Sequence, residues 1–456
     1  MKEYDYVIIG GGTAGLVLLY KAIDKGKKIA LIDKGLIGGT CANTGCVPSK
    51  MLIYPADVVT AVHHATKLGI NAEIISIDFN AIMRRMRDYV AENRKNMEDG
   101  IKDIKGVDYF RDEGHFVEDY TLEVGRERIR GRQIFIASGS RGRIPPIKGL
   151  DTIDYLTNET LLGLTEKPES MIIIGGGYIA AEYGHFYAAM GTRVTIIQDN
   201  DRLLPNEEPE ISDLLLHEFK KRMIVHTNMH AEEAQKDGGG CIIKGKDNKT
   251  GEMKSFAAQK VLVAVGRQSN ADLLKVENTG IETDEKNYIR VSDHLETTKP
   301  DIWAFGDAIG RQMFTHAGDR EAEIAWHNAV NIGKKKMDFS AVPHAVYTHP
   351  QIASIGLTEE QARKHHTILV GQAGYPDIVL GNAMEQDIGF AKAIVEKKSR
   401  KILGFHIVGP EAPILLQEVT NAMAKGGAVD DLLEGLHIFP SLSELIPEAL
   451  GHLEQR

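Results

Sequence analysis

Apolar runs separated by glycine-rich turns give the start of the chain a strand, turn, helix and strand pattern. The run "DYVIIGGGTAG" (5–15) predicts a buried strand that leads directly into a tight turn. The stretch "LVLLYKAIDKG" (16–26) predicts a helix, and "KIALID" (28–33) predicts a second strand. This order is that of a βαβ unit with parallel strands.

The same pattern recurs in the middle of the chain and then gives way to another. Residues 170–200 predict an apolar strand, a glycine-rich turn, a helix and a second strand. After about residue 341, "FAKAIVEKK" and "KILGFHIVG" alternate as antiparallel strands do, and helices are predicted over "APILLQEVTNAMAKGG" and "DDLLEGL". The predicted fold class is α/β, with two Rossmann-like dinucleotide-binding domains and a C-terminal α+β domain.

Composition and charge exclude several function classes. The 456 residues suffice for about three domains, and a net charge of −10 with interspersed signs offers no basic stripe for nucleic acid. The longest apolar stretch, 6–20, is interrupted by four glycines and does not predict a membrane span. Residues 1–9 lack a secretory signal pattern, and three cysteines cannot form a secreted disulfide framework, so we expect a cytoplasmic protein.

The first glycine-rich turn has the spacing of a dinucleotide fingerprint. Gly10, Gly12 and Gly15 allow a tight turn and the close approach of a pyrophosphate to a helix N-terminus. Asp33, at the end of the second strand, can accept a hydrogen bond from a ribose hydroxyl.

The second turn, Gly175-x-Gly177-x-x-Ala180, predicts a second dinucleotide. The position equivalent to Asp33 is Gln198, and Asp199 follows it. An amide can bond a ribose hydroxyl, whereas the neighbouring carboxylate would repel a 2′-phosphate. We therefore expect NAD(H) to be favoured over NADP(H).

Two of the three cysteines stand close together in "GGTCANTGCVPSK" (38–50). A structural zinc site needs about four ligands in close pairs, and no second pair accompanies Cys41 and Cys46. We expect both cysteines at the start of a helix, where the dipole and Lys50 favour a thiolate, so a redox-active pair is preferred over two inert thiols. Cys241, on a predicted strand, is expected to be a bystander thiol.

These motifs resemble those of the flavoprotein disulfide reductases, which include lipoamide dehydrogenase, glutathione reductase and mercuric reductase. The resemblance covers essentially the whole chain. It rests on "GGTCxNxGCVPSK", on the two fingerprints, and on the segments "IASGSRGRIP", "VLVAVGRQSN" (261–270), "DIWAFGDAIG" (301–310) and "THPQIASIGLTE" (348–359).

The resemblance implies an enzyme that binds FAD and NAD(P)H and works as a homodimer with an active site shared between subunits. Neither nucleic acid nor a membrane is an expected partner. The implied domains are a first FAD-binding segment at 1–148, an NAD(P)-binding domain at 149–268, a second FAD-binding segment at 269–340 and a dimerisation domain at 341–456.

The resemblance also implies roles for individual residues. Hydride passes from nicotinamide to one face of the flavin, and electrons pass to the disulfide on the other face. Cys46 would be the flavin-proximal thiol that forms a charge-transfer complex, and Cys41 the interchange thiol that meets substrate. Lys50 and Glu182 would lie beside the flavin nitrogen that receives hydride, where a cation stabilises the reduced flavin and the carboxylate limits the cost of burying it. The expected cofactor-binding residues are Gly10, Gly12, Thr13, Ala14, Gly15, Asp33, Lys34, Gly39, Thr40, Lys50, Gly114, Ser138, Gly139, Asp307, Thr315, Gly175, Gly177, Tyr178, Ile179, Glu182, Gln198, Asp199 and Gly266.

One position departs from the family pattern. Disulfide-specific members carry a His-Pro-Thr-x-x-Glu signature whose histidine, from the partner subunit, accepts the substrate thiol's proton. Here Pro440, Ser441 and Glu444 match, but the histidine position is Phe439, and losing a positioned acid–base group costs about 10²–10⁴ in rate.

Three accounts of Phe439 remain open. His437 substitutes for the missing base, or the acceptor is a metal ion or quinone that needs no thiol proton transfer, or an unusual or protein-bound disulfide is reduced slowly. Mercuric reductases share the Phe-Pro pair but have a C-terminal cysteine pair that "GHLEQR" lacks. We expect a dihydrolipoamide dehydrogenase-like enzyme with altered acid–base chemistry; the alternative is a metal-ion or quinone reductase on the same scaffold. No resident metal site is predicted.

Overall fold

The computed structural model describes residues 1–23 and 26–455, which divide into two compact units. One unit contains residues 1–51, 83–143 and 266–339, and the other contains the remaining described residues. The helix predicted over 16–26 is observed as α1 (Thr13–Ala22). Its predicted positions 24 and 25, and the last residue of the domain predicted to end at 456, lie outside the described residues.

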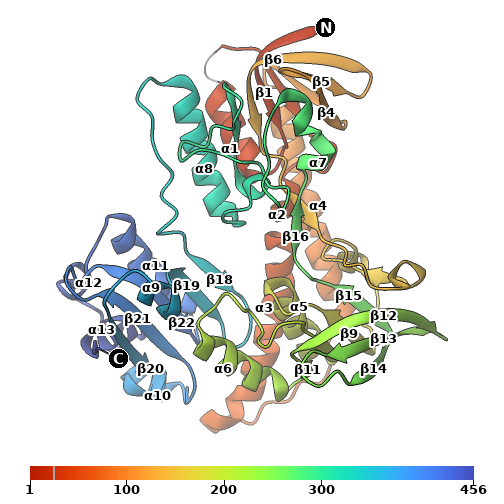
Figure 1. The fold of residues 1–456 in the computed structure, drawn as a ribbon. Coiled ribbons are helices and arrows are strands. Elements are labelled where there is room, and N and C mark those ends of the chain that lie inside the picture. Colours follow the sequence, from red (N-terminus) through yellow and green to blue (C-terminus); the bar gives the residue numbers. More distant parts are fainter. Residues whose placement is uncertain (24–25, 456) are drawn as a thin grey trace. The chain divides into compact units, whose positions relative to one another are not determined.

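The first unit is built on a seven-stranded sheet in the order β3-β2-β1-β6-β5-β4, with β17 also paired to β6 (Figure 1). Strands β3, β2, β1, β6 and β17 are parallel, and β4 and β5 extend the sheet as antiparallel strands. β2 is apolar and buried at every position, as expected for a parallel strand covered on both faces. The elements are β1 (Lys2–Ile9), α1, β2 (Ile29–Ile32), α2 (Gly39–Asn43), the start of α3 (Cys46–His64), most of α4 (Phe79–Lys102), β3 (Val107–Phe110), β4 (Gly114–Glu118), β5 (Thr121–Val124), β6 (Glu127–Ile136), β7 (Ser140–Gly142), β16 (Arg267–Ser269), α7 (Ala271–Leu274), β17 (Ile302–Ala304) and α8 (Thr315–Val330).

The second unit combines three sheets: parallel β11-β10-β9-β15-β8, antiparallel β12-β13-β14, and antiparallel β18-β19-β22-β21-β20 (Figure 1). Its elements include the rest of α3, β8 (Tyr155–Leu156), β9 (Ser170–Ile174), α5 (Tyr178–Ala189), β10 (Arg193–Ile197), α6 (Pro209–Lys220), β11 (Ile224–His226), β12 (Met229–Asp237), β13 (Gly240–Asp247), β14 (Met253–Ala258), β15 (Lys260–Val263), β18 (His344–Val346), β19 (Ile352–Gly356), α9 (Glu359–Arg363), β20 (Ile368–Gly374), α10 (Val379–Ala383), β21 (Phe390–Glu396), β22 (Ile402–Val408), α11 (Ala412–Ala424), α12 (Val429–Leu433) and α13 (Leu445–Gly451).

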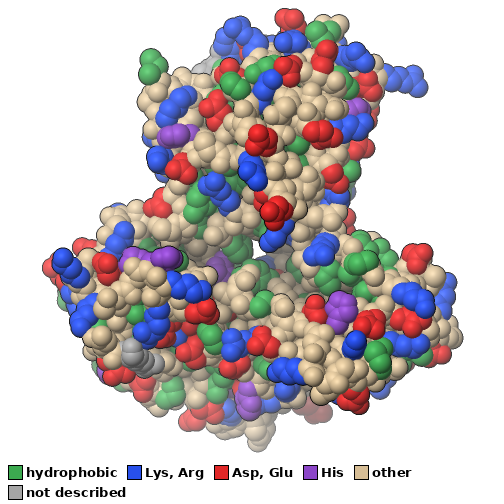
Figure 2. Space-filling model, viewed as in Figure 1, with side chains coloured by type: hydrophobic (Ala, Val, Ile, Leu, Met, Phe, Trp, Pro, Cys, Tyr) green, Lys and Arg blue, Asp and Glu red, His purple; other side chains and the backbone are tan. Residues whose placement is uncertain are grey.

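The α/β fold class is confirmed, and both glycine-rich turns follow parallel strands. The helix predicted over "DDLLEGL" is shorter than expected, because α12 ends at Leu433. Figure 2 shows acidic and basic side chains mixed over the face that it presents, as the interspersed charges of the sequence predict. None of the described helices has the length and apolar character that crossing a bilayer requires.

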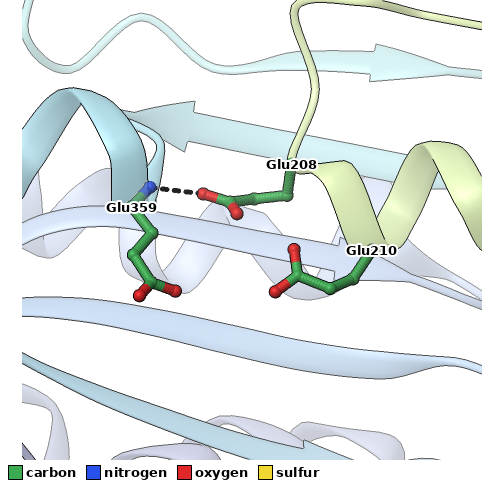
Figure 3. Close-up of side chains that lie close together, drawn as sticks. All are labelled: Glu208, Glu210 and Glu359. Carbon is green, nitrogen blue, oxygen red and sulfur yellow. Dashed lines mark hydrogen bonds between the residues drawn. The ribbon is translucent and has the colours of Figure 1, made fainter. Parts of the chain in front are cut away.

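A buried lysine joins the parallel sheet region of the second unit to its C-terminal sheet. Lys392 on β21 lies 2.8 Å from a carboxylate oxygen of each of Glu208, Glu210 and Glu359. Figure 3 shows the three side chains converging, with the Glu359 N–H donating to Glu208 (2.5 Å). We call these four residues the Lys392 cluster. The carboxylates alone have the spacing of a cation site, but the ammonium group already lies among them.

Charge balance in the Lys392 cluster depends on the lysine. Burial favours neutral carboxyls, yet the hydrogen bonds from Lys392 hold the pKa values of Glu210 and Glu359 below their ordinary range. Burial acts against the charge of Lys392, but its three carboxylate partners raise its pKa.

Lys392→Met should therefore lower the free energy of unfolding by about 3–5 kcal/mol at pH 7, because it leaves buried Glu208 without its cation. A carboxyl whose pKa is lower in the folded than in the unfolded state stabilises the fold at pH values above its unfolded-state pKa. That stabilisation is lost as the pH falls through its folded-state pKa. The deficit should shrink below about pH 4.5. Urea unfolding from pH 7 to pH 4 measures it, with Glu210→Gln, at a half-exposed carboxylate, as the milder control. A deficit that does not change with pH would contradict this account.

Candidate functional site

The turn after β1 packs tightly against neighbouring backbone. Gly10 has φ +110°, and a Cβ at this position would lie 2.1 Å from the Ala137 carbonyl oxygen. A Cβ at Gly15 would lie 2.0 Å from the Gly10 carbonyl oxygen. Both positions therefore require glycine, and the turn leads to the N-terminus of α1 at Thr13.

The cysteine segment is fastened to this same turn. The Gly38 N–H donates to the Gly11 carbonyl oxygen (2.7 Å), and a Cβ at Gly39 would lie 2.8 Å from the Gly12 Cα. Gly39 also has φ +58°, which favours glycine. The Asn43 amide donates to the Gly39 carbonyl oxygen (3.0 Å), which stabilises the short helix α2.

The two cysteines lie on different helices. Cys41 is within α2, whereas Cys46 is the first residue of α3. The expectation that both would open one helix is wrong, because α2 ends at Asn43 and Thr44 leaves the helical conformation. Cys41 nevertheless lies near enough to influence the protonation of Cys46, and the Thr315 hydroxyl lies 3.5 Å from the Cys46 sulfur.

The two thiols hold their protons unequally. The hydrogen bond from Cys41 lowers the pKa of Cys46 to about 6 against the opposing effect of burial, and the Thr315 hydroxyl and the charge of Lys50 lower it further. The same bond, together with burial, raises the pKa of Cys41. At neutral pH this arrangement favours a thiolate at Cys46 and a protonated Cys41.

Lys50 and Glu182 belong to different compact units, and each has its own support. Lys50 is one turn along α3 from Cys46, and its ammonium donates to the Ser49 hydroxyl (3.3 Å). Glu182 on α5 is buried and accepts a hydrogen bond from the Tyr347 N–H (3.0 Å).

The first nucleotide site contains polar atoms that need a further partner. Ser138 Oγ and Asn43 Oδ1 are buried, and neither has a hydrogen-bond partner within the described residues. Asp33, just after β2, accepts from the Gly11 N–H (2.5 Å). Because buried polar atoms are rarely left unpaired, these residues fit a ligand rich in hydroxyl and phosphate oxygens such as FAD.

Arg267 lies among residues predicted for this site, although sequence analysis did not select it. Its Nε donates to the Ser140 hydroxyl (2.6 Å) and lies 3.5 Å from Asp307, and one terminal nitrogen lies 3.5 Å from the Thr40 hydroxyl. Its place beside Gly266 in "VGRQSN" was the available signal. Among the other predicted residues, Ala14 lies in α1, Gly114 is buried at the start of β4, Gly139 has φ +65° beside open space, and Lys34 pairs with Glu113 at the surface (3.1 Å).

The second glycine-rich turn repeats the geometry of the first. A Cβ at Gly175 would lie 2.2 Å from the Ala264 carbonyl oxygen, while Gly177 faces open space. Tyr178 and Ile179 open helix α5 immediately afterwards. The Tyr178 hydroxyl donates to Glu207 (3.1 Å).

Gln198 and Asp199 differ in accessibility. Gln198 is buried beneath Gly176, and its amide nitrogen donates to the Arg202 carbonyl oxygen (3.1 Å). Asp199 is exposed, accepts from the Asn248 amide (2.9 Å) and lies 3.2 Å from the His230 ring.

Near the C-terminus, Phe439 is exposed, and the predicted residues His437 and Glu444 are both hydrogen-bonded within this region. Phe439 is 71% exposed. The His437 ring hydrogen-bonds to Glu418 (2.8 Å), and Glu444 accepts from the Ser441 N–H (3.0 Å) at the start of its own helical turn. Cys241 is buried in β13, where burial raises the pKa of its thiol.

Comparisons with known proteins identify two matching family models. Residues 4–333 match the pyridine nucleotide-disulphide oxidoreductase family, and residues 342–450 match its dimerisation domain. FAD is the cofactor that this family implies, and the dimerisation domain implies a homodimer.

Individual relatives carry several different activities in their names. A mycothione reductase from Mycobacterium tuberculosis is 32% identical over 99% of both chains, and a dihydrolipoyl dehydrogenase from Bacillus subtilis is 32% identical over 98% of this chain and 97% of its own. A mercuric reductase from Staphylococcus aureus is 30% identical over 97% of this chain and 81% of its own. A Cu(II) complex of the HOCl-induced flavoprotein disulfide reductase RclA from Escherichia coli superposes with TM-score 0.88 at 29% identity, over 99% of both chains. This chain belongs to the pyridine nucleotide-disulphide oxidoreductase family.

Proposed function

We propose that this chain is an NADH-dependent FAD enzyme that passes electrons through Cys41 and Cys46 to a soft metal ion, with Cu(II) as the test acceptor. The observation that carries the proposal is Phe439, an exposed apolar side chain where disulfide-reducing members have their base. The His437 ring is hydrogen-bonded to Glu418, a pairing that can also orient a general base, so His437→Ala below tests whether His437 substitutes for that base. A metal-ion acceptor needs no proton from residue 439.

The thiol pair supports this chemistry. FAD, when bound, accepts hydride from nicotinamide and returns electrons to a disulfide. We assign the interchange role to Cys41 and the flavin-proximal role to Cys46, and we keep for Lys50 and Glu182 the roles in hydride transfer that the family resemblance implies. When the reduced pair meets two Cu(II) ions, each ion gains one electron, a Cys41–Cys46 bond forms, and the Cys41 proton passes to solvent. Sulfur ligands suit the Cu(I) product.

The Cu(II) complex of the E. coli relative supports this choice of acceptor. The second candidate is a disulfide oxidoreductase of the dihydrolipoyl type, which the B. subtilis relative supports. A quinone acceptor would also need no base at residue 439, but no relative described above names one. The active site shared between subunits, the bounds of the four domain segments and a cytoplasmic location stay predictions.

Acceptor class can be tested at residue 439. Purified wild-type enzyme should oxidise NADH faster with Cu(II) than with lipoamide or mycothiol disulfide, and Phe439→His should leave the Cu(II) rate within about twofold. His437→Ala should likewise have little effect, and Cys41→Ser should abolish Cu(II) reduction. Rapid oxidation of dihydrolipoamide by the wild-type enzyme would instead favour the disulfide candidate. The same holds if Phe439→His raises the rate of dihydrolipoamide oxidation by about tenfold or more.

The unequal thiols make a second prediction. In the NADH-reduced protein, iodoacetamide should label Cys46 first, with a rate that rises through an apparent pKa of about 6, because only the thiolate reacts. Cys41→Ala removes the largest cause of the lowered pKa and should move this midpoint up by about one unit or more. Mass spectrometry after timed labelling gives the rates, and Cys241→Ser serves as the unaffected control. Labelling of Cys41 before Cys46 would contradict the assignment of the thiolate to Cys46.

Nucleotide preference can be tested at Asp199. Wild type should bind and use NADH with higher kcat/KM than NADPH, because the Asp199 carboxylate repels a 2′-phosphate. Asp199→Arg should narrow or invert this ratio by replacing repulsion with a phosphate partner. Stopped-flow flavin reduction with each nucleotide measures it. A wild-type preference for NADPH would be incompatible with the proposed role.

A further inference from the structure

Tyr178 is held by residues outside its own helix. It is the first residue of α5, directly after Gly177 in the second nucleotide turn. Its hydroxyl donates to Oε1 of Glu207 at 3.1 Å. Glu207 lies just before α6, and its side chain is completely buried.

Glu207 collects three donors from three separate elements. The His344 ring on β18 lies 2.7 Å from the same Oε1, and the Ser354 hydroxyl on β19 donates to Oε2 at 2.7 Å. Burial favours a neutral carboxyl, but the hydrogen bonds from His344 and Ser354 hold the pKa of Glu207 below its ordinary value. An ionised acceptor makes stronger hydrogen bonds than a neutral one, so Glu207 attracts the Tyr178 hydroxyl although their oxygens are 3.1 Å apart.

The ring of Tyr178 is constrained as well as its hydroxyl. It stacks on the His344 imidazole, with centroids 5.7 Å apart and planes inclined by 27°. Burial and the Glu207 charge raise the pKa of Tyr178, so its hydroxyl remains a donor at neutral pH. Rotating this side chain would break a charged hydrogen bond and an aromatic contact together.

We propose that Glu207 and His344 are positioning residues for nicotinamide nucleotide binding, because they fix Tyr178 beside the glycine turn before the nucleotide arrives. A side chain that is already ordered loses little conformational freedom on binding, so affinity rises without a new contact to the ligand. The inference rests on the proposed use of NADH. It adds Glu207 and His344 to the residues that serve nucleotide binding. Glu207 lies in the 144–265 part of the second unit and His344 in the 340–455 part, and neither belongs to the glycine fingerprint.

Nucleotide affinity and turnover should respond differently to these substitutions. Glu207→Gln keeps the shape of the side chain but removes its charge, and Tyr178→Phe removes only the hydroxyl. Each should raise the Kd and KM for NADH by about fivefold, with kcat within twofold, since uniform binding is lost and not transition-state stabilisation. The double variant should bind no more weakly than either single variant, because one substitution weakens and the other removes the same Tyr178–Glu207 interaction. Calorimetric titration of NADH into the full-length FAD-loaded protein, reduced beforehand with dithionite so that no hydride transfer contributes heat, gives Kd, and steady-state rates give KM and kcat.

Glu210→Gln is the matched control. It lies three residues from Glu207 but belongs to the Lys392 cluster, and it should leave the Kd for NADH unchanged. If Glu207→Gln does not fold, Tyr178→Phe still decides the question. Wild-type affinity in Tyr178→Phe or Glu207→Gln, or losses that multiply in the double variant, would overturn the inference alone. A wild-type protein that binds neither NADH nor NADPH would overturn the proposed function and this inference with it.

Discussion

The close approach of Gly39 to Gly12 is the constraint on which the site depends. No side chain fits between these backbones, and the hydrogen bond from Gly38 to Gly11 keeps them in register. Because of this contact, the cysteine segment cannot move independently of the first nucleotide turn. The cysteine segment and the glycine turn are therefore held against each other. This contact would keep the thiols at a fixed place relative to a dinucleotide bound at the turn.

The local backbone geometry of this segment makes the two thiols chemically different. The break between α2 and α3 places Cys46 at a helix N-terminus, while Cys41 remains in the preceding helix and lowers the pKa of Cys46. Because the pKa of Cys46 is lowered, its thiolate is favoured at neutral pH. The pKa of Cys41 is raised, so Cys41 keeps its proton. Phenylalanine at residue 439 cannot accept a proton from a substrate thiol. This residue therefore favours electron acceptors whose reduction needs no proton transfer at this position.

Three glutamates in one short segment of the second unit serve two unlike environments. Glu207 faces Tyr178, His344 and Ser354, whereas Glu208 and Glu210 face Lys392. Each buried carboxylate has partners from the C-terminal sheet, so the segment is fastened to that sheet by charge as well as by packing. Breaking the Lys392 cluster should lower folding stability. Breaking the contacts of Glu207 should weaken nucleotide affinity.

The sequence by itself determined the elements whose signal is local. The apolar runs around "GGGTAG" and "GGGYIAAE" predicted strand, turn and helix because glycine spacing and apolar periodicity act over a few residues. Cys41, Cys46 and Lys50 were selected from their spacing, from the lack of further zinc ligands and from the resemblance to the flavoprotein disulfide reductases. Only the tertiary structure decided that Glu207 meets His344, 137 positions away, or that Lys392 lies among three carboxylates. Read singly, each of these residues is an ordinary charged or polar residue on a solvated surface. Their burial and pairing follow from how distant strands and helices pack, and no local pattern records that packing.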